Sequence, residues 1–271
     1  MKTAIYILIG LLNLGNLFSQ NSFVINFKQN ETISNKEGKI SRFDVMYLPL
    51  IKVPDTLYYI ERAGHKMWIN GQELLDTLIK ELGRDAIQKQ KVYYGIDTLS
   101  QILYSRYLYE FEEPILYNYY LGKNIVRFML LRSFDSPLMI KLEYNSDSVI
   151  LYQKFLDNRI DRVGINLYGN ILGGNFNVFT EQRLLNMHEN RKVINNSVIS
   201  TIDSLIYNSE IKKNIPTYNS IEGFDGAYWI LEIHDESGYY YIYRWSPSED
   251  TSIRKIASYL IDLSEIKMKI Y

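Results

Sequence analysis

The chain has 271 residues, with 30 lysine and arginine residues against 31 aspartate and glutamate residues and no cysteine. The lack of cysteine excludes disulfides, a thiol nucleophile and thiolate zinc sites. The formal net charge of −1, with no long block of one sign, argues against nucleic acid or an anionic membrane surface as a partner. Tyrosine is frequent, with 24 residues, and we expect most of them to fill half-buried strand positions rather than to stack on sugars.

Residues 1–20 have the pattern of a secretory signal peptide. Lys2 precedes an apolar run from Ala4 to Phe18, which small and polar residues follow. The run is shorter than the ~20 apolar residues that a spanning helix needs, so a cleaved signal is favoured over a retained anchor. We therefore predict an exported protein, periplasmic or extracellular, with no integral membrane segment after signal removal.

Residues 21–113 are predicted to form a small, mostly helical N-terminal subdomain. Leucine and isoleucine recur at helical spacing over 72–82, and a second helix begins at residue 97 or 98 and runs to about Phe111. Short extended segments are expected at 23–27, 44–53 and 57–61.

Residues 114–271 are predicted to form one α+β domain. The strands expected there are 125–132, 138–144, 148–155, 164–168 and 176–180, followed by a helix over about 198–207. A last helix has a continuous apolar stripe, and Ser248 is placed to cap it. Short connections between the strands favour an antiparallel sheet packed against the helices.

The segment from Gly226 to Pro247 reads as a β-hairpin, and the rest of this domain is expected to be organised around it. Aromatic and branched residues dominate both arms. A three-residue loop of Glu236, Ser237 and Gly238 would place Asp235 opposite Tyr239.

This register decides which side chains of the hairpin share a face. Trp229 then lies opposite Trp245 on an uncharged face, which is expected to be core. On the other face Glu232 and Arg244 become diagonal cross-strand neighbours that could form an ion pair. A two-residue or four-residue loop would exchange the face of one arm and remove this pair.

Three sequence blocks between about residues 125 and 264 are distinctive. They are Val126-Arg127-Phe128, the block from Asp225 to Glu232, and Arg244-Trp245-Ser246-Pro247. Their order resembles an uncharacterised family of bacterial proteins, many of them exported, and the Arg-Trp-Ser-Pro block is its most specific part. The resemblance implies the order and topology of the strands and transfers no catalytic residue, because no activity is assigned to the family. The chain departs from the family pattern after Phe155, where it lacks a Gly-Gly-Tyr segment.

The sequence offers few candidates for catalysis. It contains no zinc-protease, nucleophile-elbow, phosphate-loop or dinucleotide motif, and we predict neither a cofactor nor a metal site. The weak catalytic candidates are Asp225, Glu232 and Arg244. A glycosidase needs two acids facing each other ~5–10 Å apart. In such an enzyme Asp225 and Glu232 would be the acidic residues, and Arg244 would orient the substrate. A lone glutamate paired with arginine on a strand is more often structural.

These observations favour a non-enzymatic exported domain that binds a macromolecule, either an unknown protein or a glycan. The alternatives are a glycosidase-like hydrolase that uses acidic residues, and a structural component of the cell envelope. A hydrolase requires a concave pocket with two converging acids, whereas a binding module does not.

Overall fold

The computed structural model describes residues 23–40, 45–49, 56–62, 65–69, 72–91, 98–160, 185–214 and 225–267. The predicted signal peptide and the predicted strands at 164–168 and 176–180 lie outside these residues. Within the described part of the chain, every helix is too short or too polar to cross a bilayer.

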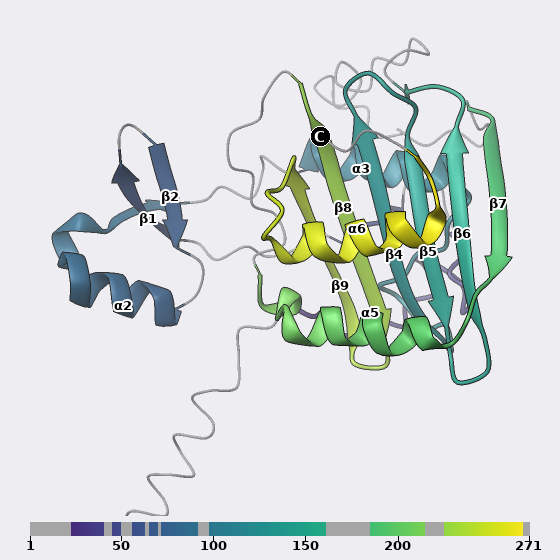
Figure 1. The fold of residues 1–271 in the computed structure, drawn as a ribbon, viewed down its shortest axis with the longest axis horizontal. Helices are drawn as coiled ribbons and strands as arrows, with labels where there is room; N and C mark the ends of the chain where they lie inside the picture. Colours follow the sequence, from purple (N-terminus) through teal and green to yellow (C-terminus); the bar gives the residue numbers. More distant parts are fainter. Residues whose placement is uncertain are drawn as a thin grey trace, which may run out of the picture.

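A six-stranded antiparallel sheet forms the centre of the molecule (Figure 1). Its strands are β4 (Asn124–Arg132), β5 (Leu138–Tyr144), β6 (Val149–Leu156), β7 (Met187–Val193), β8 (Ala227–Asp235) and β9 (Gly238–Trp245). Their order across the sheet is β7-β6-β5-β4-β8-β9, so β7 and β9 are the two edges. The predicted strands 125–132, 138–144 and 148–155 correspond to β4, β5 and β6 within one residue at each end.

Helices cover both faces of this sheet. α3 (Thr98–Glu110) lies behind it in Figure 1, whereas α5 (Ser197–Asn208) and α6 (Ser252–Ser264) cross its front. The predicted α+β fold, an antiparallel sheet packed against helices, is therefore confirmed. The predicted start of α6 is wrong: its N-cap is Thr251, and the hydroxyl of Ser248 donates to Asp250 Oδ1 instead.

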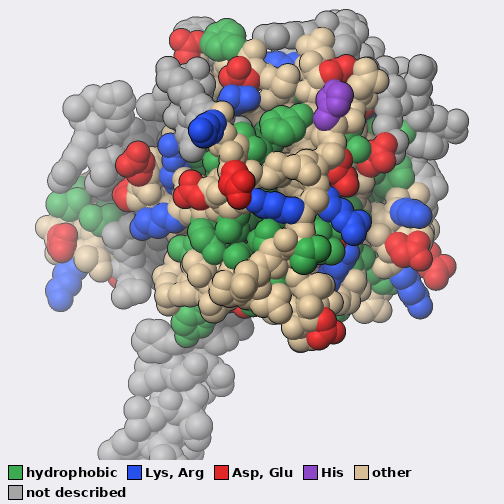
Figure 2. Space-filling model, turned by 45° about the vertical axis from the view of Figure 1, so that its right-hand side comes forward, with side chains coloured by type: hydrophobic (Ala, Val, Ile, Leu, Met, Phe, Trp, Pro, Cys, Tyr) green, Lys and Arg blue, Asp and Glu red, His purple; other side chains and the backbone are tan. Residues whose placement is uncertain are grey.

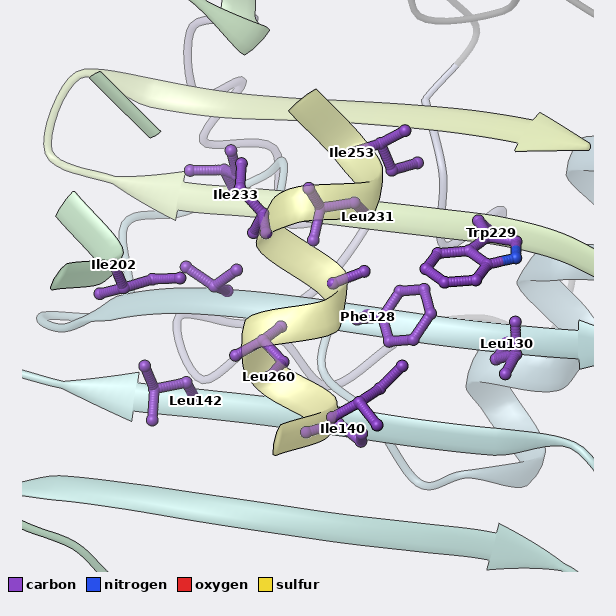
Figure 3. Packing of buried hydrophobic residues seen from close by; sticks show 14 of the residues in the cluster. Phe128, Leu130, Ile140, Leu142, Ile202, Trp229, Leu231, Ile233, Ile253 and Leu260 are labelled. Atoms are coloured by element: carbon purple, nitrogen blue, oxygen red, sulfur yellow. The ribbon is translucent and has the colours of Figure 1, made fainter. Parts of the chain in front are cut away.

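The core under α5 and α6 consists of uncharged side chains. Alternate residues of the strands point to this side, and they meet one apolar stripe from each helix (Figure 3). The labelled residues of this core are Phe128, Leu130, Ile140, Leu142, Ile202, Trp229, Leu231, Ile233, Ile253 and Leu260. Each is almost fully buried, which stabilises the fold by roughly 1.5–3 kcal/mol per large apolar side chain.

The core under α3 is rich in tyrosine. Tyr239, Tyr241 and Tyr243 project from β9 and are fully buried together with Tyr104 and Tyr107 of α3. The rings of Tyr104 and Tyr243 meet edge to face at 5.4 Å. These tyrosines are used in packing, but they lie deeper than the half-buried strand positions that the sequence led us to expect.

Residues 56–91 form a smaller unit, drawn at the left of Figure 1. Three antiparallel strands, β1 (Thr56–Arg62), β2 (His65–Ile69) and β3 (Gln88–Lys91), are arranged in the order β2-β1-β3. They are joined by α2 (Gln72–Leu82) and the 3₁₀ helix η1 (Arg84–Ala86), with a small core around Leu75. The predicted mostly helical subdomain over 21–113 is therefore corrected: this unit contains a sheet, and α3 packs into the core of the larger one.

The β8–β9 hairpin has a different register from the predicted one. The loop has two residues, so Asp235 pairs with Gly238, Trp229 faces Arg244, and Trp245 faces Tyr228. The predicted Glu232–Arg244 pair is thereby removed, and Trp245 lies on the α3 face rather than beside Trp229.

The N-terminal segment, which is remote in sequence, pairs with the hairpin directly after the turn. Ile25 and Tyr239 exchange backbone hydrogen bonds of 2.6 and 2.9 Å. Gly238 has φ +133°, and a Cβ atom there would lie 2.7 Å from the carbonyl oxygen of Ile25. Gly238 is therefore required where two backbone segments meet, rather than as the third loop residue.

Candidate binding groove

The structure places Glu232 in the interior rather than in a cleft. Its side chain lies on the α3 face of β8 and is 1% exposed. Arg127 of β4 donates two hydrogen bonds of 2.6 Å to the two carboxylate oxygens, and Tyr239 donates a third of 2.8 Å. This fork geometry makes Arg127, and not Arg244, the partner of Glu232.

The other two catalytic candidates lie elsewhere. Arg244 is on the opposite face of the sheet, across from Trp229. Asp225 is exposed before β8 begins, seven residues from Glu232, which corresponds to roughly 20 Å along an extended strand. The structure therefore does not bring Asp225, Glu232 and Arg244 together, and it gives this trio no pair of converging acids.

Glu232 belongs to a buried network of ions between the sheet and the segment after α3. The Glu113 carboxylate forms ion pairs with three cations: Arg127 Nη1 at 3.1 Å, Lys141 Nζ at 2.9 Å and Lys154 Nζ at 2.7 Å. Burial alone would raise the pKa of Glu113, but the three cations outweigh it and lower the pKa to about 2. Because these groups satisfy one another away from solvent, we assign the network to the stability of the fold.

A groove lies instead at the end of the sheet where β4 begins and β5 and β8 end. Two adjoining hollows of 620 and 650 Å³ share four lining residues, Asn124, Tyr144, Asp203 and Asp235. Asn124 and Tyr144 come from the sheet, and Asp203 comes from α5. The two hollows thus form one groove between the sheet end and α5, with a size suited to a small ligand or part of a polymer.

The floor of the groove is held by Tyr144 and Asp203. The Tyr144 hydroxyl donates a 2.6 Å hydrogen bond to Asp203 Oδ1. Burial, together with this bond to a carboxylate, raises the pKa of Tyr144 far above its usual range, so the phenol keeps its proton. The remaining lone pairs of the Asp203 carboxylate are acceptors along the groove.

Asp235 forms a second polar wall at the hairpin turn. Lys212, in the 3₁₀ helix η4 (Ile211–Lys213), lies 2.5 Å from Asp235 Oδ2, and the Ser237 backbone donates to Oδ1 at 2.9 Å. Burial alone would raise the pKa of Asp235, but the hydrogen bonds from Lys212 and Ser237 hold it below its usual range. Asp235 is therefore ionised at neutral pH, which suits an acceptor and not a general acid.

Two tyrosine rings border the groove. Tyr207 at the end of α5 is 83% exposed, and Tyr120 is 36% exposed. Tyr120 is stacked on the ring of His234, with a centroid distance of 5.4 Å and an interplanar angle of 20°. His234 is itself fully buried. Both tyrosine rings offer apolar faces beside polar groups.

His234 positions the loop that carries Tyr120. Leu121 N–H donates to Nε2 at 3.1 Å, so the proton is on Nδ1, which donates to Leu116 O at 2.8 Å. Burial lowers the pKa of His234 to about 4. The neutral imidazole therefore ties two backbone segments to β8 and has a structural role.

The charge of the groove is nearly balanced. Three lysines and four carboxylates line the two hollows, and ion pairs join Lys212 to Asp235 and Lys213 to Glu210. Among the residues that the structure describes, no group of three or more histidine, aspartate or glutamate side chains is arranged to hold a metal ion. The lining suits an uncharged polar ligand better than a polyanion or polycation.

Sequence reasoning did not identify this groove. Asp203 is recognisable only as a polar residue opposite the apolar stripe of its helix, and Tyr144 only as the last residue of a strand. Their meeting depends on α5 lying across the end of β5, which no local pattern encodes. The sequence placed Asp235 beside the hairpin loop, but it did not predict the contact with Lys212.

Comparison with known proteins adds no constraint: no family model matches the chain, and no curated protein is significantly similar to it. The resemblance to an exported bacterial family therefore stays a prediction.

Proposed function

We propose that this protein is an exported, non-enzymatic binding domain whose groove at the β4, β5 and β8 ends takes an uncharged glycan. The observation that carries the proposal is the combination of Asn124, Asp203 and Asp235 with the exposed rings of Tyr120 and Tyr207 around two adjoining hollows. Amide and carboxylate oxygens accept hydrogen bonds from sugar hydroxyls, and tyrosine rings cover the apolar C–H faces of sugars.

Two further observations support binding over catalysis in this groove. Asp235 is held ionised by Lys212 and Ser237, so it lacks the raised pKa of a glycosidase acid. Two buried carboxylates, Glu113 and Glu232, are enclosed by their own cations outside the groove. Export is proposed from the signal-like pattern of residues 1–20.

The test is binding of the purified protein to an array of neutral and acidic oligosaccharides, followed by calorimetry on the best ligand. Tyr207→Ala is expected to weaken binding by about tenfold, since stacking and burial at one ring contribute ~1–2 kcal/mol. Because Tyr207 is 83% exposed, its removal should leave the melting temperature unchanged.

Phe134→Ala is the matched control, since Phe134 is also largely exposed, at 66%, and is not a lining residue of either hollow. It is expected to leave glycan binding unchanged. Absence of binding to every oligosaccharide on the array, or equal effects of the two substitutions, would reject the glycan proposal. Release of shortened products from a bound glycan would reject the non-enzymatic part alone.

A further inference from the structure

The outer edge of β7 is a regular run of backbone groups. Ile194 N–H donates to Val149 O, and Asn186 O accepts from Asp157 N–H, both at 3.0 Å. Since these bonds run toward β6, even-numbered residues of β7 direct their backbone groups to β6 and odd-numbered residues direct theirs outward. The outward set is Met187, Glu189, Arg191 and Val193.

This edge is accessible along its length. Of the seven residues of β7, five have exposed side chains and none is buried, and Val193 is 73% exposed. Figure 2, which brings the right-hand side of Figure 1 forward, shows lysine and arginine mixed with acidic side chains on this side of the molecule. An exposed strand edge can template pairing with another strand unless its side chains oppose it.

We propose that β7 pairs antiparallel with β7 of a second copy of this chain, about a two-fold axis at Asn190. In this register Glu189 lies opposite Arg191 of the second copy, and the two-fold axis creates the same pair twice. Met187 likewise meets Val193 of the second copy. All four outward-directed residues then form hydrogen-bonded pairs.

The neighbouring registers are disfavoured by charge. Only registers that pair odd residues with odd residues satisfy the outward backbone groups. If the two-fold axis moves by one residue to Glu189, Glu189 of one copy lies opposite Glu189 of the other. If it moves to Arg191, the Arg191 residues of the two copies lie opposite each other. Like charges directly opposite each other are unfavourable, so the register at Asn190 alone combines a full ladder with opposite charges.

The side-chain contacts that each monomer already makes are compatible with this pairing. On the other face of β7, Lys192 forms a 3.0 Å ion pair with Glu265, the residue that follows α6. The charge of Lys192 is therefore balanced within one copy. Glu189 contacts Lys154 at 3.2 Å, but Lys154 also has Glu113 at 2.7 Å. Since one strand pair makes a small interface, the dimer should be weak and concentration-dependent.

Sedimentation velocity of the purified protein over a wide concentration range tests the proposal. The wild type is expected to pass from monomer to dimer, and Arg191→Glu to raise the dissociation constant by about tenfold or more, since it places carboxylates opposite each other twice. Lys255→Glu is the matched control, because it makes the same charge change at an exposed site on α6 and should leave association unchanged.

A charge exchange separates this interface from others. Glu189→Arg alone should also prevent association, whereas an equimolar mixture of the Glu189→Arg and Arg191→Glu proteins should form a heterodimer, since every opposite pair is restored. Thermal melting of each variant checks that it is folded. If one of the two variants is not folded, the other single substitution still tests the interface. A protein that stays monomeric at all concentrations, or a dimer that Arg191→Glu leaves intact, would overturn the proposal.

Discussion

The face of the central sheet under α5 and α6 is packed with aliphatic and aromatic side chains, whereas the face under α3 combines tyrosines with buried ions. On the first face Phe128 of β4 lies 5.1 Å from Trp229 of β8, ring to ring. On the second face the preceding residue of β4, Arg127, is fully buried and bound to Glu232 and Glu113. One strand therefore supplies an apolar contact and an ionic contact in successive positions.

The two faces differ in how they tolerate change. When an apolar side chain is shortened, the free energy of unfolding falls roughly with the number of atoms removed. The neighbouring apolar groups are not left with an unpaired charge. A buried ion depends on its counter-ion, because an unpaired charge in the interior costs far more than the pair contributes. The ionic face is thus expected to hold the register of the strands strictly, since a shift of one residue would place Arg127 among apolar side chains.

The largest expected effect is that of Arg127→Met, which leaves the carboxylates of Glu232 and Glu113 with fewer cations. Removing one partner of a buried ion pair costs roughly 3–5 kcal/mol. The free energy of unfolding in urea measures this loss. The double variant Arg127→Met/Glu232→Gln should recover most of it, because it removes both charges and keeps an acceptor for Tyr239. Additive losses in the double variant would show that the pair is not coupled.

Trp229→Ala tests the apolar face. Trp229 is fully buried, and large-to-small changes of this kind cost roughly 3–5 kcal/mol. Trp245 is the matched control, because it lies on the other face, is only half-buried and meets Tyr228 edge to face at 4.7 Å. Trp245→Ala should cost about 1–2 kcal/mol. Equal losses for the two substitutions in chemical denaturation would contradict the observed hairpin register.

The difference between the faces also explains what the sequence could predict. Runs of apolar, aromatic and branched residues placed β4, β5, β6 and β8 correctly, and the apolar stripe placed α5 within one residue at each end. These signals are local, because one strand or helix carries its own buried face. β7 was missed because its sequence, Met-His-Glu-Asn-Arg-Lys-Val, is polar and becomes a strand by pairing with β6.

The contacts that sequence reasoning missed join segments far apart in the chain. The predicted pairing of Glu232 with Arg244 was wrong. Its partner Arg127 is 105 residues away, and only the β4–β8 pairing brings the two together. The close backbone contact that requires a glycine at 238 is with Ile25, more than 200 residues away. The groove depended in the same way on Asp203 reaching Tyr144 across 59 residues.

A pH titration of stability below pH 7 sharpens the comparison, because the described part of the α3 face holds two buried groups, His234 and Glu113, whose pKa values are lowered. The unfolded chain binds a proton at His234 below about pH 6.5, whereas in the folded chain burial lowers the pKa to about 4. Stability should therefore fall as the pH drops from 6.5 to 4, by about 3 kcal/mol at this site. The depressed pKa of Glu113 makes a second loss, between about pH 4.5 and 2.

His234→Asn separates the two pH ranges in which stability is expected to fall. Asparagine can donate to Leu116 O as the Nδ1–H group does, and it does not titrate. The variant should lose the decline between pH 6.5 and 4 and keep the lower one, since Glu113 is untouched. Arg127, Asp235 and Lys123 also act on His234 electrostatically. The pKa of Asp235 is lowered and that of Arg127 is raised, so these two groups stay charged between pH 6.5 and 4. A wild-type decline that persists unchanged in His234→Asn would mean that another group titrates there, and that His234 is not the neutral anchor of the Tyr120 loop.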